Sequence, residues 1–378
     1  MEIAVLKESK PGENRVALTP DVVKTLVKKG YQVCIESGAG DNSYFSDMDY
    51  MSVGAEIKVE KKAVCKADVI LKINAPTLEE VDFMDDKCCV ISLLYGYTQP
   101  DLLNAFNQKA ITAIGMDAIP RISRAQKMDA LSSQANLAGY KAVIVGSNAM
   151  SKIFPLLMTA AGTITPAKVL IFGAGVAGLQ AIATAKRLGA VVEVTDVRQE
   201  TKEQVESLGG KFLTVESTDT NTTSGGYAVD VSSEFLQKQK QLIESRIKEA
   251  DLVITTALII GKKSPMLIPK EMVETMKKGA VIVDMAVEWG GNCELSQANE
   301  TKIYQGITII GEPNLPSLLP TNASQLYAVN ISTLLQHISS PEQLLIDKED
   351  EITNGCLITY AGQTVHTFTN QILNKNQG

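Results

Sequence analysis

The fold is decided by the stretch Lys168-Val169-Leu170-Ile171-Phe172-Gly173-Ala174-Gly175-Val176-Ala177-Gly178, in which an apolar run leads into the pattern GxGxxG. A helical stretch, 179–188, follows directly. In such a strand–turn–helix unit the glycines permit a tight turn, close approach of a pyrophosphate and close helix packing. The start of the helix adds N–H groups that hold phosphates. We predict dinucleotide binding by Gly173, Ala174, Gly175, Val176, Ala177 and Gly178; the motif alone leaves open a glycine-rich turn without a nucleotide.

Asp196 ends the next apolar run, 191–196. A carboxylate at this position accepts hydrogen bonds from the adenosine ribose hydroxyls and repels a 2′-phosphate. Asp196 therefore favours NAD(H) over NADP(H). Arg198 leaves two alternatives, because it could pair with Asp196 or could instead suit a 2′-phosphate.

Apolar runs alternate with helical stretches on both sides of this motif, as a doubly wound parallel sheet requires. Strands are expected near 2–6, 31–35, 68–73, 88–94, 111–114, 168–172, 191–196, 252–255, 281–284 and 307–310. Helices are expected near 20–29, 77–84, 100–108, 234–249 and 269–278. We predict an α/β protein with two Rossmann-like doubly wound parallel-sheet domains, the second a dinucleotide-binding fold inserted in the first.

The length of 378 residues also indicates two domains. A helical tract from about Arg124 to Ala160 is the expected interdomain connection. A C-terminal helix, 323–338, and a hairpin of 356–360 against 363–368 are too small to fold alone. We expect them to rejoin the first domain, so that 1–138 plus 321–378 form the N-terminal domain and 139–320 the NAD(H)-binding domain.

Two further segments carry candidate site residues. The polar stretch Ser217 to Tyr227 contains Gly225 and Gly226, and is typical of a long mobile loop of the kind that covers a ligand. In the stretch Pro120 to Tyr140, Ser123 with Gln126 forms the pattern of a capping box, which predicts a helix start. At helical spacing Gln126, Asp129 and Ser133 share a polar face, with Ser132 at its edge. Such a polar face is expected either where a helix lines a cleft or where it is simply exposed to solvent.

Composition narrows the functional classes. The 36 Lys and Arg residues against 43 Asp and Glu give a net charge of −7 without a dense basic run, which argues against nucleic acid as a partner. No window reaches the roughly 18 to 20 apolar residues that a bilayer span requires, so we expect no direct membrane span. The six cysteines form no CxxC pair and only two histidines occur, so no metal site is expected.

The stretches 121–134 and 173–198 resemble the NAD(H)-binding α-subunit domain (domain I) of proton-translocating NAD(P) transhydrogenases, within the alanine dehydrogenase-like superfamily. The likeness spans nearly the whole chain. It includes Arg15-Val16-Ala17-Leu18-Thr19-Pro20, Gly225-Gly226-Tyr227-Ala228, Thr255-Thr256-Ala257-Leu258, Val283-Asp284-Met285-Ala286-Val287-Glu288 and Gly290-Gly291-Asn292-Cys293. Such long matches are far more specific than GxGxxG.

This resemblance implies an enzyme of the Si/Re-specific, proton-translocating type, active only with its partner components. Hydride passes between NAD(H) here and NADP(H) on a partner domain, and proton movement belongs to a transmembrane subunit. The resemblance also implies a homodimer and a cytoplasmic location, peripheral on the cytoplasmic face of the inner membrane. The chain is then a separate subunit or a truncated form of a longer one.

The resemblance also assigns residues. Those that surround the nicotinamide and orient its carboxamide are Arg121, Gln126, Asp129 and Ser132. The nucleotide-binding set extends beyond the glycine turn to Asp196, Val197, Arg198, Gly226, Tyr227, Thr256, Ala257 and Leu258. Direct hydride transfer between nicotinamides needs orientation more than acid–base groups, so His337 and His366 are interpreted as structural.

Two other functions compete with this one. An alanine dehydrogenase-like NAD-dependent amino-acid oxidoreductase would use Arg15 and Lys72 to hold a keto acid. However, Leu93-Leu94-Tyr95-Gly96-Tyr97 stands where that family has its catalytic His, and Glu288 replaces its Asp. Loss of a general acid–base commonly costs a factor of about 10² to 10⁴ in rate, so this function is disfavoured. A non-catalytic NAD(H)-sensing module would use the same glycine turn and loop.

Overall fold

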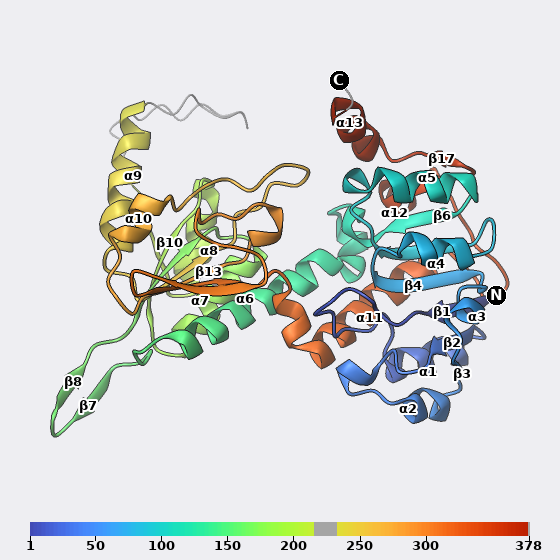
Figure 1. The fold of residues 1–378 in the computed structure, drawn as a ribbon, viewed down its shortest axis with the longest axis horizontal. Helices are drawn as coiled ribbons and strands as arrows, with labels where there is room; N and C mark the ends of the chain where they lie inside the picture. Colours follow the sequence, from blue (N-terminus) through green and yellow to red (C-terminus); the bar gives the residue numbers. More distant parts are fainter. Residues whose placement is uncertain (215–232, 377–378) are drawn as a thin grey trace. The chain divides into compact units, whose positions relative to one another are not determined.

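The computed structural model describes residues 1–214 and 233–376. The chain divides into two compact units, Met1–Gln134 with Pro316–Gly378, and Ala135–Leu315. Helix α6 (Ala130–Ala149) carries the chain from the first unit into the second (Figure 1). The domain boundaries expected from the sequence, 1–138 plus 321–378 and 139–320, stay predictions.

The first unit is a doubly wound sheet of eight strands in the order β17-β16-β6-β5-β4-β1-β2-β3. Strands β1 to β6 pair in parallel, whereas β16 runs antiparallel to β6 and β17 antiparallel to β16. Its strands are β1 (Glu2–Val5), β2 (Gln32–Glu36), β3 (Glu56–Lys58), β4 (Val69–Asn74), β5 (Cys89–Leu93), β6 (Thr112–Gly115), β16 (Leu357–Tyr360) and β17 (Gln363–Thr364). Its helices are α1 (Pro20–Lys28), α2 (Asp47–Ser52), α3 (Lys61–Val64), α4 (Leu78–Phe83), α5 (Pro100–Gln108), α11 (Pro320–His337), α12 (Glu351–Cys356) and α13 (Thr367–Asn376).

The second unit holds a seven-stranded sheet in the order β11-β10-β9-β12-β13-β15-β14, in which β14 alone is antiparallel. Its strands are β9 (Lys168–Phe172), β10 (Val191–Thr195), β11 (Lys211–Phe212), β12 (Leu252–Thr255), β13 (Val281–Asp284), β14 (Glu300–Tyr304) and β15 (Ile307–Gly311). Its helices are α7 (Val176–Arg187), α8 (Lys202–Ser207), α9 (Ser233–Ile247) and α10 (Lys270–Glu274). The order reverses between β9 and β12, which is where doubly wound sheets bind ligands.

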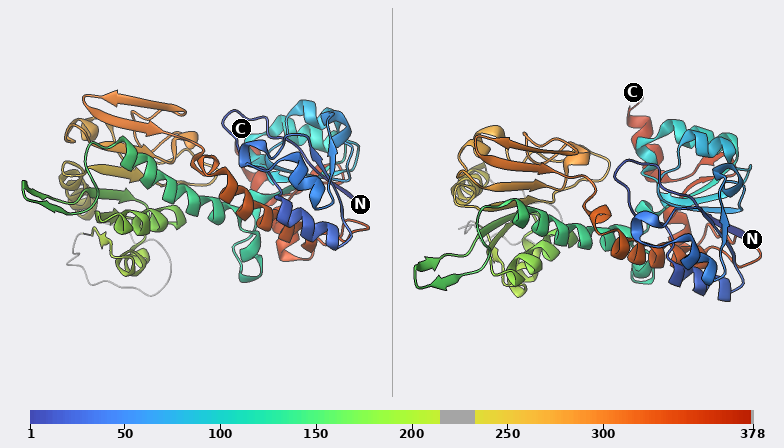
Figure 2. Two further views of the ribbon diagram at one scale, coloured as in Figure 1. Left: turned by 90° about the horizontal axis from the view of Figure 1, so that it is seen from below. Right: turned by 60° about the horizontal axis from the view of Figure 1, so that its bottom comes forward.

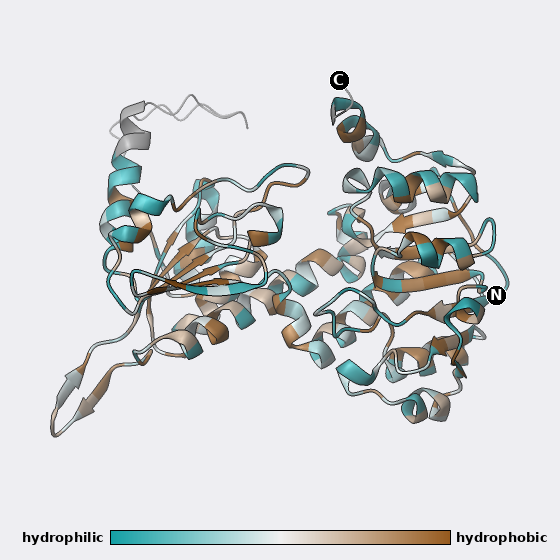
Figure 3. Cartoon of the chain, viewed as in Figure 1, coloured by the Kyte–Doolittle hydropathy of each residue, from teal (hydrophilic) through white to brown (hydrophobic). Residues whose placement is uncertain are grey.

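Both sheets are buried on both faces, as parallel sheets require. One apolar core of the first unit contains Val5 and Leu71, and the other contains Ala4 and Ile70, so neighbouring residues of one strand enter opposite cores. In the second unit, the neighbouring residues Ile171 and Leu170 likewise belong to the two cores on opposite faces of the sheet. The near-continuous hydrophobic character of these strands is visible in Figure 3. The predicted fold class, two doubly wound sheets, is confirmed.

Two of the expected elements are wrong. The helical tract expected from Arg124 to Ala160 is interrupted, because residues 123–128 form a 3₁₀ turn and α6 covers only Ala130–Ala149. Residues beyond it form an antiparallel hairpin of β7 (Leu157–Thr159) and β8 (Gly162–Ile164). The C-terminal hairpin is shorter than expected: β17 ends at Thr364, and α13 begins at Thr367.

The β7–β8 hairpin extends away from the remainder of the second unit in each view (Figures 1 and 2). Its apolar side chains are exposed, with 43% of the Leu157 surface and 74% of the Met158 surface accessible. An isolated two-stranded hairpin is marginally stable in water, because neither face is covered. The exposed apolar face therefore marks a surface suited to contact with another chain.

Candidate functional site

The glycine turn lies between β9 and α7, at the carboxyl end of the central strand. Gly173 has φ of +102°, and a Cβ there would collide with the Thr256 hydroxyl. A Cβ on Gly178 would collide with the Gly173 carbonyl oxygen, so this glycine permits close packing of α7. At Gly175 the nearest atom to an added Cβ is Arg198 Nη2, 4.0 Å away. The surroundings of Gly175 are thus open, as approach of a phosphate group requires.

The Asp196 carboxylate is tied to the glycine turn. Its Oδ2 accepts a 2.6 Å hydrogen bond from the Ala174 backbone N–H, and its Oδ1 accepts one of 2.8 Å from the Arg198 backbone N–H. Arg198 also donates from Nε and Nη2 to the two carboxylate oxygens, at 3.1 and 2.9 Å. Burial alone would raise the pKa of Asp196, but these hydrogen bonds outweigh it and lower the pKa. Of the alternatives for Arg198, pairing with Asp196 is the one in this structure.

The segment after β12 lies beside the same turn. The Thr256 hydroxyl donates to the Phe172 carbonyl at 3.1 Å and to the Gly173 carbonyl at 3.4 Å. Three large apolar side chains at the carboxyl ends of β9, β10 and β12 are exposed: Val176 (41%), Val197 (92%) and Leu258 (52%). Apolar side chains beside an open backbone turn are the kind of lining that small-molecule sites have. Gly226 and Tyr227 lie outside the described residues.

The segment expected to hold the nicotinamide belongs to the first unit. The expected capping box at Ser123 and Gln126 does not form, because residues 123–128 make a 3₁₀ turn without a side-chain cap. Arg121 and Gln126 are exposed. Because this stretch is not an α-helix, the polar face derived from helical spacing does not apply to it.

Asp129 instead holds the start of α6. Its Oδ1 accepts a 2.9 Å hydrogen bond from the Ser132 backbone N–H, and its Oδ2 accepts one of 2.6 Å from the Ser132 hydroxyl. A carboxylate in this arrangement caps a helix. Two of the four expected positioning residues are therefore in direct contact. Asn330 of α11 supports the preceding turn, since its Nδ2 donates to the Lys127 carbonyl at 2.8 Å.

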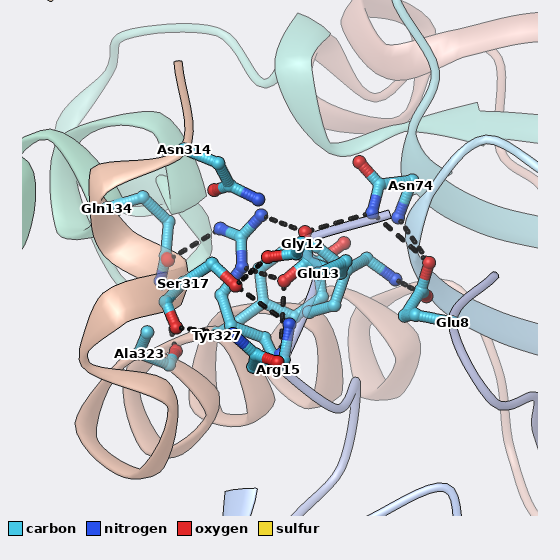
Figure 4. Close-up of polar contacts among 12 residues, drawn as sticks. Glu8, Gly12, Glu13, Arg15, Asn74, Gln134, Asn314, Ser317, Ala323 and Tyr327 are labelled. Carbon is cyan, nitrogen blue, oxygen red and sulfur yellow. Dashed lines mark hydrogen bonds and ion pairs between the residues drawn. The ribbon is translucent and has the colours of Figure 1, made fainter. Parts of the chain in front are cut away.

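Arg15 and Lys72, the two cations expected to hold a keto acid in an alanine dehydrogenase-like enzyme, are paired with carboxylates of this chain. Figure 4 shows Arg15 with its partners Glu13 and Gln134. Arg15 donates from Nε to Glu13 Oε1 at 2.7 Å and from Nη2 to Glu13 Oε2 at 2.6 Å. Its Nη1 donates to Gln134 Oε1 at 2.8 Å. The Lys72 side chain is 1% exposed, and its Nζ lies 3.6 Å from Glu8 Oε2 and 3.5 Å from Glu80 Oε2.

These carboxyls differ in their proton affinity. Burial raises the pKa of Glu8, although Lys72 opposes it. Burial also acts on Glu13, but the charge and hydrogen bonds of Arg15 outweigh it and lower the pKa to about 2. Glu13 is therefore a carboxylate at neutral pH and provides the counter-charge of Arg15.

The two histidines have local partners. The His337 ring lies 2.8 Å from Asp350 Oδ2, and His366 Nδ1 lies 2.8 Å from the Thr369 hydroxyl. Within residues 1–214 and 233–376, no helix is long and apolar enough to cross a membrane. Over the same part of the chain, no cluster of three His, Cys, Asp or Glu could hold a metal ion.

Comparison with known proteins places the chain in a family. The model of the alanine dehydrogenase/PNT N-terminal domain matches residues 4–138, and that of the C-terminal domain matches residues 142–367. The chain belongs to this family. A curated relative from Rhodospirillum rubrum, the first part of its NAD(P) transhydrogenase subunit alpha, is 47% identical over 97% of this chain and 98% of its own length. The NAD(P) transhydrogenase subunit alpha of Haemophilus influenzae is 42% identical over 97% of this chain and 72% of its own length.

The two branches of the family differ in their likeness to this chain. Alanine dehydrogenase 2 of Staphylococcus aureus is 30% identical over 88% of this chain and 86% of its own. Among solved structures, a transhydrogenase from Sinorhizobium meliloti has a TM-score of 0.89 at 41% identity, covering 97% of this chain and 100% of its own. An L-alanine dehydrogenase has a TM-score of 0.83 at 29% identity, covering 99% of each chain. The chain thus groups with the transhydrogenase α subunits, as the sequence motifs predicted.

Sequence reasoning assigned no role to three residues that organise these sites. Glu13 forms an ion pair with Arg15. The Asp284 carboxylate accepts a hydrogen bond from the Asn292 N–H in the segment after β13, and the Asn292 side chain accepts one from the Ala257 N–H in the segment after β12. Glu13 lies two residues from Arg15, a spacing too common to carry a signal. Asp284 and Asn292 stand in the matched motifs, and the pairing of Gly290-Gly291 immediately before Asn292 was the available signal.

Proposed function

We propose that this chain binds NAD(H) at the carboxyl ends of β9, β10 and β12 and exchanges hydride with NADP(H) held by a partner domain. The proposal rests on the contact between the glycine turn and Asp196. The turn is open at Gly175, and the Asp196 Oδ2 accepts a 2.6 Å hydrogen bond from the Ala174 N–H of the same turn. Backbone N–H groups at the start of α7 would hold the pyrophosphate. Asp196 would accept hydrogen bonds from the ribose hydroxyls, and its negative charge would disfavour a 2′-phosphate.

Bound NADH supplies a hydride from its nicotinamide C4, which passes directly to the nicotinamide C4 of oxidised NADP with no substrate proton released. The residues of this chain contribute orientation, since proper alignment of two reactants lowers the barrier without acid–base groups. We assign this positioning to Arg121, Gln126, Asp129 and Ser132. The Asp129–Ser132 contact would keep two of them in a defined arrangement. Tyr227 and Gly226 complete the proposed nucleotide set.

The proposed partners follow from the same assignment. A membrane subunit would translocate protons, with this chain peripheral on the cytoplasmic face of the inner membrane, and a second copy of this chain would form a homodimer. The exposed apolar face of the β7–β8 hairpin supports the homodimer, because a marginal hairpin gains stability from contact with another chain.

The structure gives no support to amino-acid oxidation as the alternative. Arg15 is already paired with Glu13, and Lys72 lies between Glu8 and Glu80. A keto-acid carboxylate would have to displace Glu13 from the Arg15 guanidinium and leave a buried carboxylate without its counter-charge, which is costly.

The deciding experiment is single-turnover hydride transfer from NADH to an NADP analogue, after mixing with an NADP(H)-binding transhydrogenase domain. Alanine with NAD serves as the parallel reaction. Transfer that requires the partner domain, without alanine oxidation, is the expected result. Alanine oxidation by this chain alone would overturn the proposal.

A further inference from the structure

Asn292 lies in the segment that follows β13 and is fully buried, with 0% of its surface exposed. Two consecutive glycines precede it, Gly290 with φ of +98° and Gly291 with φ of +75°. This left-handed pair turns the chain back toward the end of β13. A Cβ on Gly291 would stand only 2.9 Å from Asp284 Oδ2, so the turn excludes a larger residue there.

The buried Asp284 carboxylate holds the Asn292 backbone in place. Its Oδ2 accepts hydrogen bonds from the Asn292 N–H at 2.9 Å and the Cys293 N–H at 3.0 Å. Its Oδ1 accepts hydrogen bonds from the Ala286 N–H and the Thr255 hydroxyl, each at 3.0 Å. Because Thr255 ends β12, one carboxylate joins the ends of two neighbouring strands.

The Asn292 side chain then contacts the segment after β12. Its Oδ1 accepts a 3.1 Å hydrogen bond from the Ala257 N–H, and its Nδ2 donates to the Ala257 carbonyl at 2.9 Å and the Pro265 carbonyl at 2.8 Å. These three hydrogen bonds require a side chain that has one acceptor and two donors. Among side chains of this size only the amide of asparagine supplies both, since a carboxylate cannot donate.

We propose that Asn292 is a positioning residue for the nucleotide, which keeps the 256–265 segment in the conformation that binds NAD(H). This inference rests on the proposed function. Ala257 follows Thr256, whose hydroxyl donates to the Gly173 carbonyl at 3.4 Å, and precedes the half-exposed Leu258. Asn292 therefore acts on the nucleotide through Ala257 and its two neighbours, and makes no contact of its own with the ligand.

The variant N292D separates positioning from simple packing because it keeps the size of the side chain and makes its donors depend on pH. As a carboxylate it has no donor and places a negative charge against the Ala257 and Pro265 carbonyls. Once protonated, it regains one donor. Burial and the neighbouring Asp284 carboxylate would raise the pKa of the introduced carboxyl.

The ionisable side chains near Asn292 and Asp284 include Cys293, Lys263 and Lys302, and Lys302, like Lys263, is common to wild type and every variant. Burial raises the pKa of the Cys293 thiol to about 11, so the thiol stays neutral between pH 6 and 8.5. The Lys263 side chain passes Gly290 and is common to wild type and every variant, so its effect cancels in a comparison between them. A pH response confined to N292D then reports on the introduced carboxyl.

NADH affinity is measured by equilibrium fluorescence titration between about pH 6 and 8.5 for wild type, N292D, N292A and the control N299D. Asn299 is exposed and lies in the same segment, so N299D makes the same chemical change without touching Ala257. We expect N292D to bind NADH about tenfold more weakly at pH 8.5, from the loss of two donated hydrogen bonds. The difference from wild type should shrink as the pH falls, whereas N292A should stay about tenfold weaker throughout.

Affinity of N292D and N292A equal to that of wild type at pH 8.5 would overturn the inference, as would an equal loss in N299D. Thermal unfolding of each variant is followed without nucleotide, and N292A decides the question if N292D does not fold. Failure of the proposed function itself has a different signature, because wild type would then not bind NADH at any pH.

Discussion

The Arg15 guanidinium forms a two-pronged ion pair with the Glu13 carboxylate, two residues away, with Nε to Oε1 at 2.7 Å and Nη2 to Oε2 at 2.6 Å. Both side chains are buried, at 5% and 0% exposure. A bidentate pair of this kind leaves the guanidinium plane occupied and costs free energy to break. The Arg15 guanidinium is thus occupied by a carboxylate of its own chain.

Replacing Glu13 by glutamine should destabilise the chain by about 3 kcal/mol at pH 7, because Arg15 would stay buried without a counter-charge. Glu13 has a pKa of about 2 in the folded chain, below its ordinary value of 4.5. Its stabilising contribution is therefore present above about pH 4.5 and is lost as the pH falls through about 2. Urea unfolding of wild type and E13Q at pH 7 and pH 3 tests this, with a smaller difference expected at pH 3. The exposed Glu349 provides the control E349Q, which should unfold as wild type does; equal effects of E13Q and E349Q would contradict the prediction.

Removal of the Asp196 carboxylate should weaken NADH binding about tenfold and reduce the preference over NADPH, because the ribose acceptor and the repulsion of a 2′-phosphate are lost together. R198A should keep the preference for NADH, since Asp196 would still accept from the backbone N–H groups of residues 174 and 198. Titration of D196A and R198A with both nucleotides provides the comparison. If R198A loses NADH affinity as strongly as D196A does, Asp196 is not the main ribose contact.

D129N and R121A should leave NADH affinity largely intact but slow hydride transfer to the partner domain, because the proposed role of these residues is to position the nicotinamide and not to anchor the nucleotide. Asparagine can still accept at the α6 start, so D129N retains the cap, whereas D129A should lose about 1 kcal/mol of stability. Single-turnover transfer rates, with NADH affinity measured in parallel, test this. Unaltered turnover in both variants would remove these residues from the proposed site.

Replacing Met158 by aspartate should weaken the proposed homodimer, because a charge would enter the apolar face of the β7–β8 hairpin. Met158 is 74% exposed in the single chain, so the substitution has little to disrupt within it. Sedimentation equilibrium of wild type and M158D measures the oligomeric state, and Met48, 71% exposed in the first unit, provides the control M48D. A dimer of unchanged affinity in M158D would place the interface elsewhere.

Much of the fold followed from the order of residues along the chain. The expected strand near 168–172 is β9 (Lys168–Phe172), and the expected helix at 100–108 is α5 (Pro100–Gln108). The spacing and the number of apolar residues within a short stretch of sequence are enough to indicate such elements. Short edge strands such as β11 (Lys211–Phe212) and β14 (Glu300–Tyr304) escaped prediction, because a strand at the edge of a sheet needs no continuous apolar run.

The sequence by itself determined the two doubly wound sheets, the glycine turn at Gly173–Gly178 and the family, because glycine spacing and apolar periodicity are local properties. Only the tertiary structure decided that Arg198 pairs with Asp196, that Glu13 engages Arg15, and that Asn292 contacts Ala257, 35 residues away. Hydrogen-bond partners between distant segments depend on how strands are ordered in the sheet. A buried carboxylate or amide acquires its role from the donors and acceptors that the fold brings within about 3 Å of it.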